Sequence, residues 1–174
     1  IALGGKDQVL VARFSTDLEQ TTGLLLVGGL TSVISAAVMA YAGATLAQIM
    51  PQRAADMLVA FALALAAVEL AWPVKVKPMK EPTRSYVAIG VVLLARQIGD
   101  AARFVIFALA AAAVYPITAL IGGGIAGFAA IGLGWMMGDR LEQRLPLRFL
   151  RLVLAVCTFV AAVFIGLNAR YMFL

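Results

Sequence analysis

The sequence predicts an all-α integral membrane protein with six transmembrane helices, arranged as two inverted three-helix repeats, of which the first helix is truncated at its N-terminus. Hydrophobic residues make up 63% of the chain and charged residues 13%, with a mean hydropathy of +0.99. Soluble domains are about 45–50% apolar and ~25% charged. The apolar residues also form runs long enough to span a bilayer, and parts of the sequence repeat at one constant offset.

The repeat is carried by two separated matches, both at an offset of 95 residues. Residues 43–53 align with residues 138–148, and residues 4–9 align more weakly with residues 99–104. Identical pairs include Gly28/Gly123, Gly29/Gly124, Gly43/Gly138, Leu46/Leu141, Gln48/Gln143, Pro51/Pro146 and Arg53/Arg148. With three spans in each repeat, the second must insert upside down relative to the first, which is an inverted-topology duplication.

Six apolar segments separated by polar or basic connections are interpreted as the spans. In order, they are residues 1–14, 23–49, 54–72, 86–114, 117–137 and 152–174. The first is shorter than the ~20 residues that a span needs. We interpret it as the second half of a span, with an interfacial or re-entrant piece as the alternative. The expected organisation is a first repeat at 1–72, a basic cytoplasmic loop at 73–85 and a second repeat at 86–174.

Small residues recur at the spacing of closely packed helices. A stripe of them at every fourth residue comprises Gly28, Ser32, Ala36 and Ala40, and two GxxxG pairs are Gly123/Gly127 and Gly134/Gly138. Such faces let helix backbones approach each other within the bilayer. They predict tight packing inside the bundle, or self-association or contact with other membrane proteins through the GxxxG helices.

Charged residues in the middle of the fourth apolar segment mark the candidate site. Arg96, Asp100 and Arg103 lie inside it, and each costs at least ~2.5–3.5 kcal/mol to insert. We therefore expect Lys6, Asp100 and Arg103 to face the interior of the bundle. Spacings of four and three residues place both arginines on the helical face of Asp100, so Asp100 should have a basic partner. The alternative to an ion site is a structural ion pair.

Another carboxylate, Glu69, lies three residues before Trp72 near the end of its apolar segment. Tryptophan is enriched at the membrane interface. We expect Glu69 to be a hydrated interfacial carboxylate, and the alternative is a proton or ion ligand.

Composition excludes several functions. The chain has no histidine and one cysteine, Cys157, so imidazole ligands, histidine-based catalysis and an intrachain disulfide are ruled out. No nucleophile–base pair or cofactor motif is present, so neither an enzyme nor a bound cofactor is expected. The net charge of +5 comes from short basic segments between apolar runs, which points to a lipid bilayer rather than nucleic acid as the partner.

The residues around Gly99 and their counterparts near the start of the chain resemble a known family. Paired Glu-x-Gly-Asp-Lys/Arg-Ser/Thr motifs, one per three-helix repeat, mark the GDT-type manganese/calcium–proton antiporters. Residues 97–102 and residues 2–7 stand at these motifs, and residues 138–148 are similar to bacterial members. The motifs depart from the pattern: Ala2 and Gln97 replace the glutamates, and Gly5 replaces one aspartate.

The resemblance implies an ion and proton site where the two motif helices face each other, with manganese or calcium as the transported ion. Its members are Asp100 as the metal ligand, with Gln97, Gly99, Asp7, Gly4 and Gly5, and the charge partners Lys6, Arg96 and Arg103. Two carboxylates against three cations give a net charge of +1. We therefore expect a degenerate site that binds divalent cations weakly or not at all.

Two functions follow from this. The first is a membrane protein resembling divalent cation–proton exchangers, with a degenerate site centred on Asp100. The alternative is a non-transporting structural or accessory subunit of a larger membrane complex. For location, nine lysines and arginines fall on one side of the predicted spans, against Arg53 and Arg170 on the other. The positive-inside rule then predicts a bacterial cytoplasmic (inner) membrane protein with its C-terminus outside.

Overall fold

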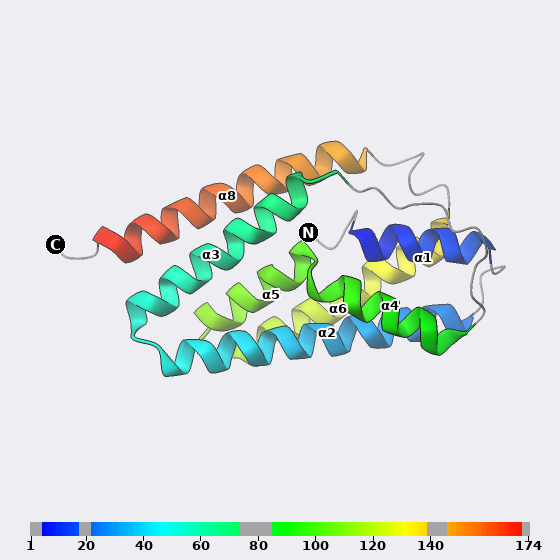
Figure 1. The fold of residues 1–174 in the computed structure, drawn as a ribbon, viewed down its shortest axis with the longest axis horizontal. Coiled ribbons are helices and arrows are strands. Elements are labelled where there is room, and N and C mark those ends of the chain that lie inside the picture. The colour runs from blue at the N-terminus through cyan, green and yellow to red at the C-terminus, as the bar shows by residue number, and fades with distance from the viewer. Residues whose placement is uncertain (1–4, 18–21, 74–84, 139–145, 172–174) are drawn as a thin grey trace.

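The computed structural model describes residues 5–17, 22–73, 85–138 and 146–171 (Figure 1). Within these ranges all regular secondary structure is α-helical. The helices are α1 (Lys6–Asp17), α2 (Thr22–Ile49), α3 (Gln52–Ala71), α4 (Tyr86–Ile98), α5 (Ala101–Ala112), α6 (Pro116–Met137) and α8 (Leu147–Tyr171). The all-helical prediction is confirmed for the described part of the chain.

Four of these helices, α2, α3, α6 and α8, are long and apolar enough to cross a membrane. Residues 86–114, expected as one span, form two successive helices, α4 and α5, of 13 and 12 residues. The break falls at Gly99 and Asp100. Glycine weakens a helix because it has no Cβ, and aspartate favours the N-cap, where its side chain accepts a backbone N–H.

The helices lie roughly along one long axis, with α4 and α5 following each other end to end (Figure 1). Along one edge α3 packs against α8, and along the opposite edge α2 packs against α6 (Figure 1). Helix α5 contacts α2, α3 and α6, whereas α1 lies mainly against α6 and α4 mainly against α2. The N-terminal ends of α1 and α5 are thereby brought to the middle of the bundle (Figure 1).

The helix ends follow from local sequence. Pro116 begins α6, where its fixed φ suits the first helical position, and α6 ends at Gly138, which has a φ of +50°. Ser85 caps α4 by accepting a hydrogen bond from the Ala88 N–H. Two expected connections are shorter than predicted, since α1 continues to Asp17 and α8 already begins at Leu147.

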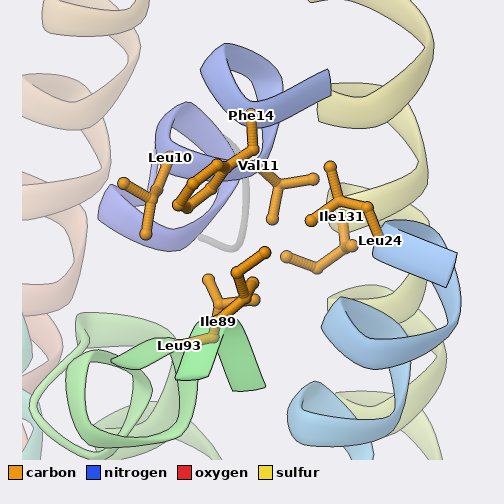
Figure 2. Close-up of a cluster of buried hydrophobic side chains, with 7 residues drawn as sticks. All are labelled: Leu10, Val11, Phe14, Leu24, Ile89, Leu93 and Ile131. Carbon is orange, nitrogen blue, oxygen red and sulfur yellow. The ribbon is translucent and has the colours of Figure 1, made fainter. Parts of the chain in front are cut away.

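Close packing explains the small residues. Gly28, Ser32, Ala36 and Ala40 are all buried, so the predicted packing face of α2 is confirmed. Gly43 lies so close to the Phe107 carbonyl of α5 that a Cβ would collide with backbone. Beside α1, by contrast, a cluster of large apolar side chains fills the space between α1, α2, α4 and α6 (Figure 2); its members are Leu10, Val11, Phe14, Leu24, Ile89, Leu93 and Ile131.

Candidate functional site

The break between α4 and α5 places a buried carboxylate at a helix N-terminus. Asp100 is the N-cap of α5 and is only 3% exposed. Its Oδ2 accepts a hydrogen bond of 3.3 Å from the Ala102 N–H, and the partial positive charge of the helix end favours an anion there. Its Oδ1 is buried and has no hydrogen-bond partner among the described residues. The candidate site is therefore centred on a carboxylate with one unused oxygen.

One turn further along α5, the guanidinium of Arg103 lies in a polar pocket and is 2% exposed. Its Nε donates to the Ser35 hydroxyl and its Nη2 to the Ser32 hydroxyl, both at 3.0 Å. Its Nη1 lies 3.7 Å from Asp7 Oδ2. Arg103 thus joins α5 to α2 and α1, which are far apart in the sequence.

Asp7 and Gln97 complete this pocket. The Gln97 Nε2 lies 3.4 Å from Asp7 Oδ2, and its Oε1 accepts a hydrogen bond of 3.0 Å from the Ser35 hydroxyl. The other carboxylate oxygen of Asp7 accepts a bond of 2.8 Å from the Gln8 N–H. These buried polar groups satisfy one another, which is the condition for a stable polar network in a low-dielectric interior.

A second polar group lies on the other side of Asp100, where α3 and α8 meet α5. Glu69 Oε2 is 3.3 Å from the Ala101 N–H and 3.4 Å from Arg151 Nη2. Arg151 Nη2 also donates to the backbone carbonyls of Glu69, at 2.7 Å, and of Trp72, at 3.4 Å. Glu69 therefore links the start of α5 to the α3–α8 pair.

The expected net charge of +1 is not found among the described side chains, where Asp7, Glu69 and Asp100 face two cations, Arg103 and Arg151. Asp7 and Glu69 both lie near enough to repel its carboxylate, and Arg103 near enough to attract it. Each of the two neighbouring carboxylates has its own arginine, Arg103 for Asp7 and Arg151 for Glu69. No lysine or arginine nitrogen among the described side chains lies within 4.0 Å of Asp100.

Several expectations need correction. Asp100 does not pair with Arg96, whose side chain is exposed, because the helix ends between them and the four-residue spacing no longer places them on one face. Arg103 pairs with Asp7 instead. Glu69 is not a hydrated carboxylate, since its side chain is 10% exposed and bonded to Arg151.

The other predicted positions are placed unevenly. Asp100 and Arg103 face the interior as expected. Gly4 and the side chain of Lys6 lie outside the described residues. Gly5 is buried and its carbonyl accepts the Val9 N–H at 3.2 Å, while Gly99 is exposed. Glycine carbonyls as ion ligands therefore stay a prediction.

Sequence reasoning missed four members of the two polar groups: Gln8, Ser32, Ser35 and Arg151. The signal for the serines was present, because Ser35 lies three residues after Ser32 on the buried stripe of α2. Arg151 could not be distinguished from the topology-setting basic residues around it, yet it is 5% exposed.

The ligand set does not form a ready-made divalent site. Calcium and manganese are hard cations that take several oxygen ligands. Among the described residues, no group of three or more histidine, cysteine, aspartate or glutamate side chains could hold a metal ion. The geometry instead presents one carboxylate without a cation partner between two neutralised ones.

Comparison with protein-family models decides the family. A model described as "Divalent cation/proton antiporter GDT1" matches residues 85–173, just over half of the chain. The chain belongs to this family. The resemblance inferred from the motifs is thus confirmed, and the match covers α4, α5, α6 and α8. No match was found among curated proteins or among solved structures.

GDT1 membership and the apolar helices together make this an integral membrane protein of the cation/proton antiporter type. Within the matched region, the break between α4 and α5 carries the buried carboxylate, and α8 carries Arg151. The pocket around Arg103 also draws on α1 and α2, which precede the matched residues.

Proposed function

We propose that this chain is a GDT1-family membrane protein with a degenerate ion site centred on Asp100, which retains one exchangeable carboxylate and binds manganese or calcium weakly or not at all. The observation that carries the proposal is the buried Asp100 Oδ1 without a hydrogen-bond partner among the described residues. An ionised carboxylate in such a place is costly unless it binds a cation or a proton. Asp100 is therefore the position at which an ion or proton would exchange.

The degeneracy follows from how the other carboxylates are used. Asp7 faces Arg103 and Glu69 faces Arg151, so neither offers a free negative charge to a metal. Removing the hydration shell of a divalent cation requires several oxygen ligands with enough negative charge. One carboxylate with neutral amide and hydroxyl neighbours falls short of that requirement.

We also infer that the two halves are inverted repeats, related by the offset of 95 residues. The helices that correspond by this offset run in opposite directions in Figure 1: α1 and α3 run from left to right, whereas α5 and α8 run from right to left. Helix α2 likewise runs opposite to α6. The offset also maps the first residues of α1 and α3 onto those of α5 and α8.

Contacts support the same relation, because an inverted pair should exchange partners across its axis. Gly43 approaches the backbone of Phe107, and Gly138 lies near the carbonyl of Ala12, the counterpart of Phe107. A second exchanged pair of contacts is Gly29 with Phe128 and Gly124 with Val33. Ser32 meets Gly127, its own counterpart, as expected for a contact on the axis.

Single-cysteine accessibility tests this topology in a Cys157→Ser background. A cysteine at Gln52, the first residue of α3, and one at Tyr115, between α5 and α6, should react from the same, external side of an inner membrane. A cysteine at Ser85 should react only from the cytoplasmic side. Labelling of Gln52 and Tyr115 from opposite sides would contradict the inverted arrangement.

Calorimetry with manganese tests the ion site. The wild-type protein should show weak or no binding, whereas Ala2→Glu, Gly5→Asp and Gln97→Glu together should create measurable binding by adding three carboxylates. The matched control adds Asp100→Asn to the triple variant and should reduce that binding. Low-micromolar binding by the wild type, abolished by Asp100→Asn, would show that the site is intact and the degeneracy wrong.

A further inference from the structure

We propose that the guanidinium of Arg103 occupies the space in which a metal ion would bind at this site, and that its positive charge is what prevents divalent ions from binding. The inference rests on the proposed function and names what blocks the metal. Loss of motif carboxylates lowers the affinity of a site, but a tethered positive charge inside it excludes a second cation by direct repulsion.

The guanidinium of Arg103 is surrounded by oxygen atoms of the kind that bind metal ions. Its three nitrogens face the hydroxyls of Ser32 and Ser35 and the carboxylate of Asp7. Hydroxyl and carboxylate oxygens are the atoms that a hard cation would use. The guanidinium therefore fills a shell of oxygen atoms contributed by α1 and α2, with the Gln97 amide oxygen one step further, on Ser35.

A glycine of α6 leaves room for the guanidinium of Arg103 and for Ser32. Gly127 of α6 lies directly against Ser32, so that a Cβ there would collide with the serine hydroxyl and would lie 3.7 Å from Arg103 Nη2. A glycine at this point lets the guanidinium and Ser32 fit between α5, α2 and α6. The pocket is thus shaped around the charged group.

Gln8, the residue that corresponds to Arg103 in the first half, is uncharged. The offset of 95 residues maps Arg103 onto Gln8, and Ser35 onto Ala130. Gln8 Nε2 donates a hydrogen bond of 2.9 Å to the Ala130 carbonyl, so a neutral amide makes the equivalent contact between helices. Glutamine is therefore the replacement for Arg103 that keeps a donor directed at α2 and removes the charge.

Removing the charge leaves a set of oxygen ligands. In Arg103→Gln, Asp7 loses its arginine, and the hydroxyls of Ser32 and Ser35 lose the charged donor that they face. The Asp100 carboxylate, which repels that of Asp7, is unchanged. Two carboxylates without a cation, together with neutral oxygens, are the type of site that hard divalent ions bind.

The test is manganese and calcium binding to purified Arg103→Gln by calorimetry. We expect binding at least ~10-fold tighter than to the wild type, because a unit charge is removed at close range in a low-dielectric site. Adding Asp100→Asn or Asp7→Asn should abolish the gain. Arg96→Gln, which removes the same charge from an exposed position on α4, and Arg103→Lys, which keeps the charge, should show no gain.

Folded Arg103→Gln without tighter binding would overturn the inference, even if the triple carboxylate variant does bind metal. That outcome would leave the proposed function standing. Equal, Asp100-dependent binding by wild type and Arg103→Gln would overturn both.

Should Arg103→Gln fail to fold, Arg103→Ala in millimolar guanidinium provides the second measurement. Free guanidinium ion should occupy the vacated shell and raise the melting temperature of Arg103→Ala, but not that of Arg96→Ala. If the ion gives no such rise, Arg103 does not occupy a cation pocket and the inference fails.

Discussion

Helices α1 and α5 make a direct comparison, because each has 12 residues and begins in the middle of the bundle. Near its start, each sends one long polar side chain to a helix of the other half: Gln8 to Ala130 of α6, and Arg103 to Ser35 of α2. The two residues correspond at the offset of 95, and their side chains differ. The contact between halves can therefore be made with or without a charge, and the identity of that residue decides the chemistry of the pocket.

The surroundings of the two helices differ as well. The cluster around α1 contains large side chains such as Phe14 and Leu24, and α4 adds Ile89 and Leu93 to it (Figure 2). The cluster of α5 with α2 contains mostly alanine: its members are Ala36, Ala40, Ile106 and Ala110. Helix α5 is held in addition by the polar link from Glu69 and Arg151. Large apolar side chains thus pack around α1, whereas α5 packs on α2 mainly through small residues and its start is linked to the α3–α8 pair by Glu69 and Arg151.

The largest effect is expected from breaking the ion pair between Glu69 and Arg151, which links α5 to the α3–α8 pair. Arg151→Gln should lower the free energy of unfolding by about 3–5 kcal/mol, because it leaves the buried Glu69 carboxylate without its cation. Denaturation of the detergent-solubilised protein measures the change. The double variant Glu69→Gln/Arg151→Gln should recover most of the loss. If the two single losses simply add in the double variant, the pair is not coupled.

A smaller effect is expected from substituting glycines at which two segments of the chain pack closely. Gly43→Ala should cost about 2 kcal/mol, because the new Cβ meets the Phe107 backbone, which cannot move as a side chain can. Gly138→Ala, its counterpart, should cost about 1 kcal/mol, mainly from the positive φ. Gly122→Ala is the control, since nothing lies within 4 Å of its Cβ position, and it should stay within about 0.5 kcal/mol. Equal costs at Gly43 and Gly122 would contradict the packing described.

The smallest effect concerns the neutral contact of α1. Gln8→Leu removes the hydrogen bond to the Ala130 carbonyl and should cost about 0.6–1 kcal/mol, the usual value of an interhelical hydrogen bond in a membrane protein. Manganese binding should not change, because no charge is altered. A change in metal affinity as large as that expected for Arg103→Gln would remove the distinction between the two positions.

Much of this fold could be predicted from the sequence, because insertion into a membrane is governed by local composition. The apolar runs located α2, α3, α6 and α8 to within a few residues. The cost of burying charge correctly placed Asp100 and Arg103 in the interior. The family followed from residues 97–102 and 138–148, although the motif carboxylates are largely replaced.

Tertiary structure alone decided which charges meet. Helical spacing assigned Arg96 and Arg103 to Asp100, but the break at Gly99 separates Arg96 from it, and α1 brings Asp7 to Arg103 from 96 positions earlier in the chain. Arg151 and Glu69 are likewise brought together only because α8 packs on α3. The sequence thus determined which residues must be kept away from lipid, since the free-energy cost of exposing a charge to lipid depends on the residue itself. Their partners depend on the packing of helices from distant parts of the chain, which no local pattern encodes.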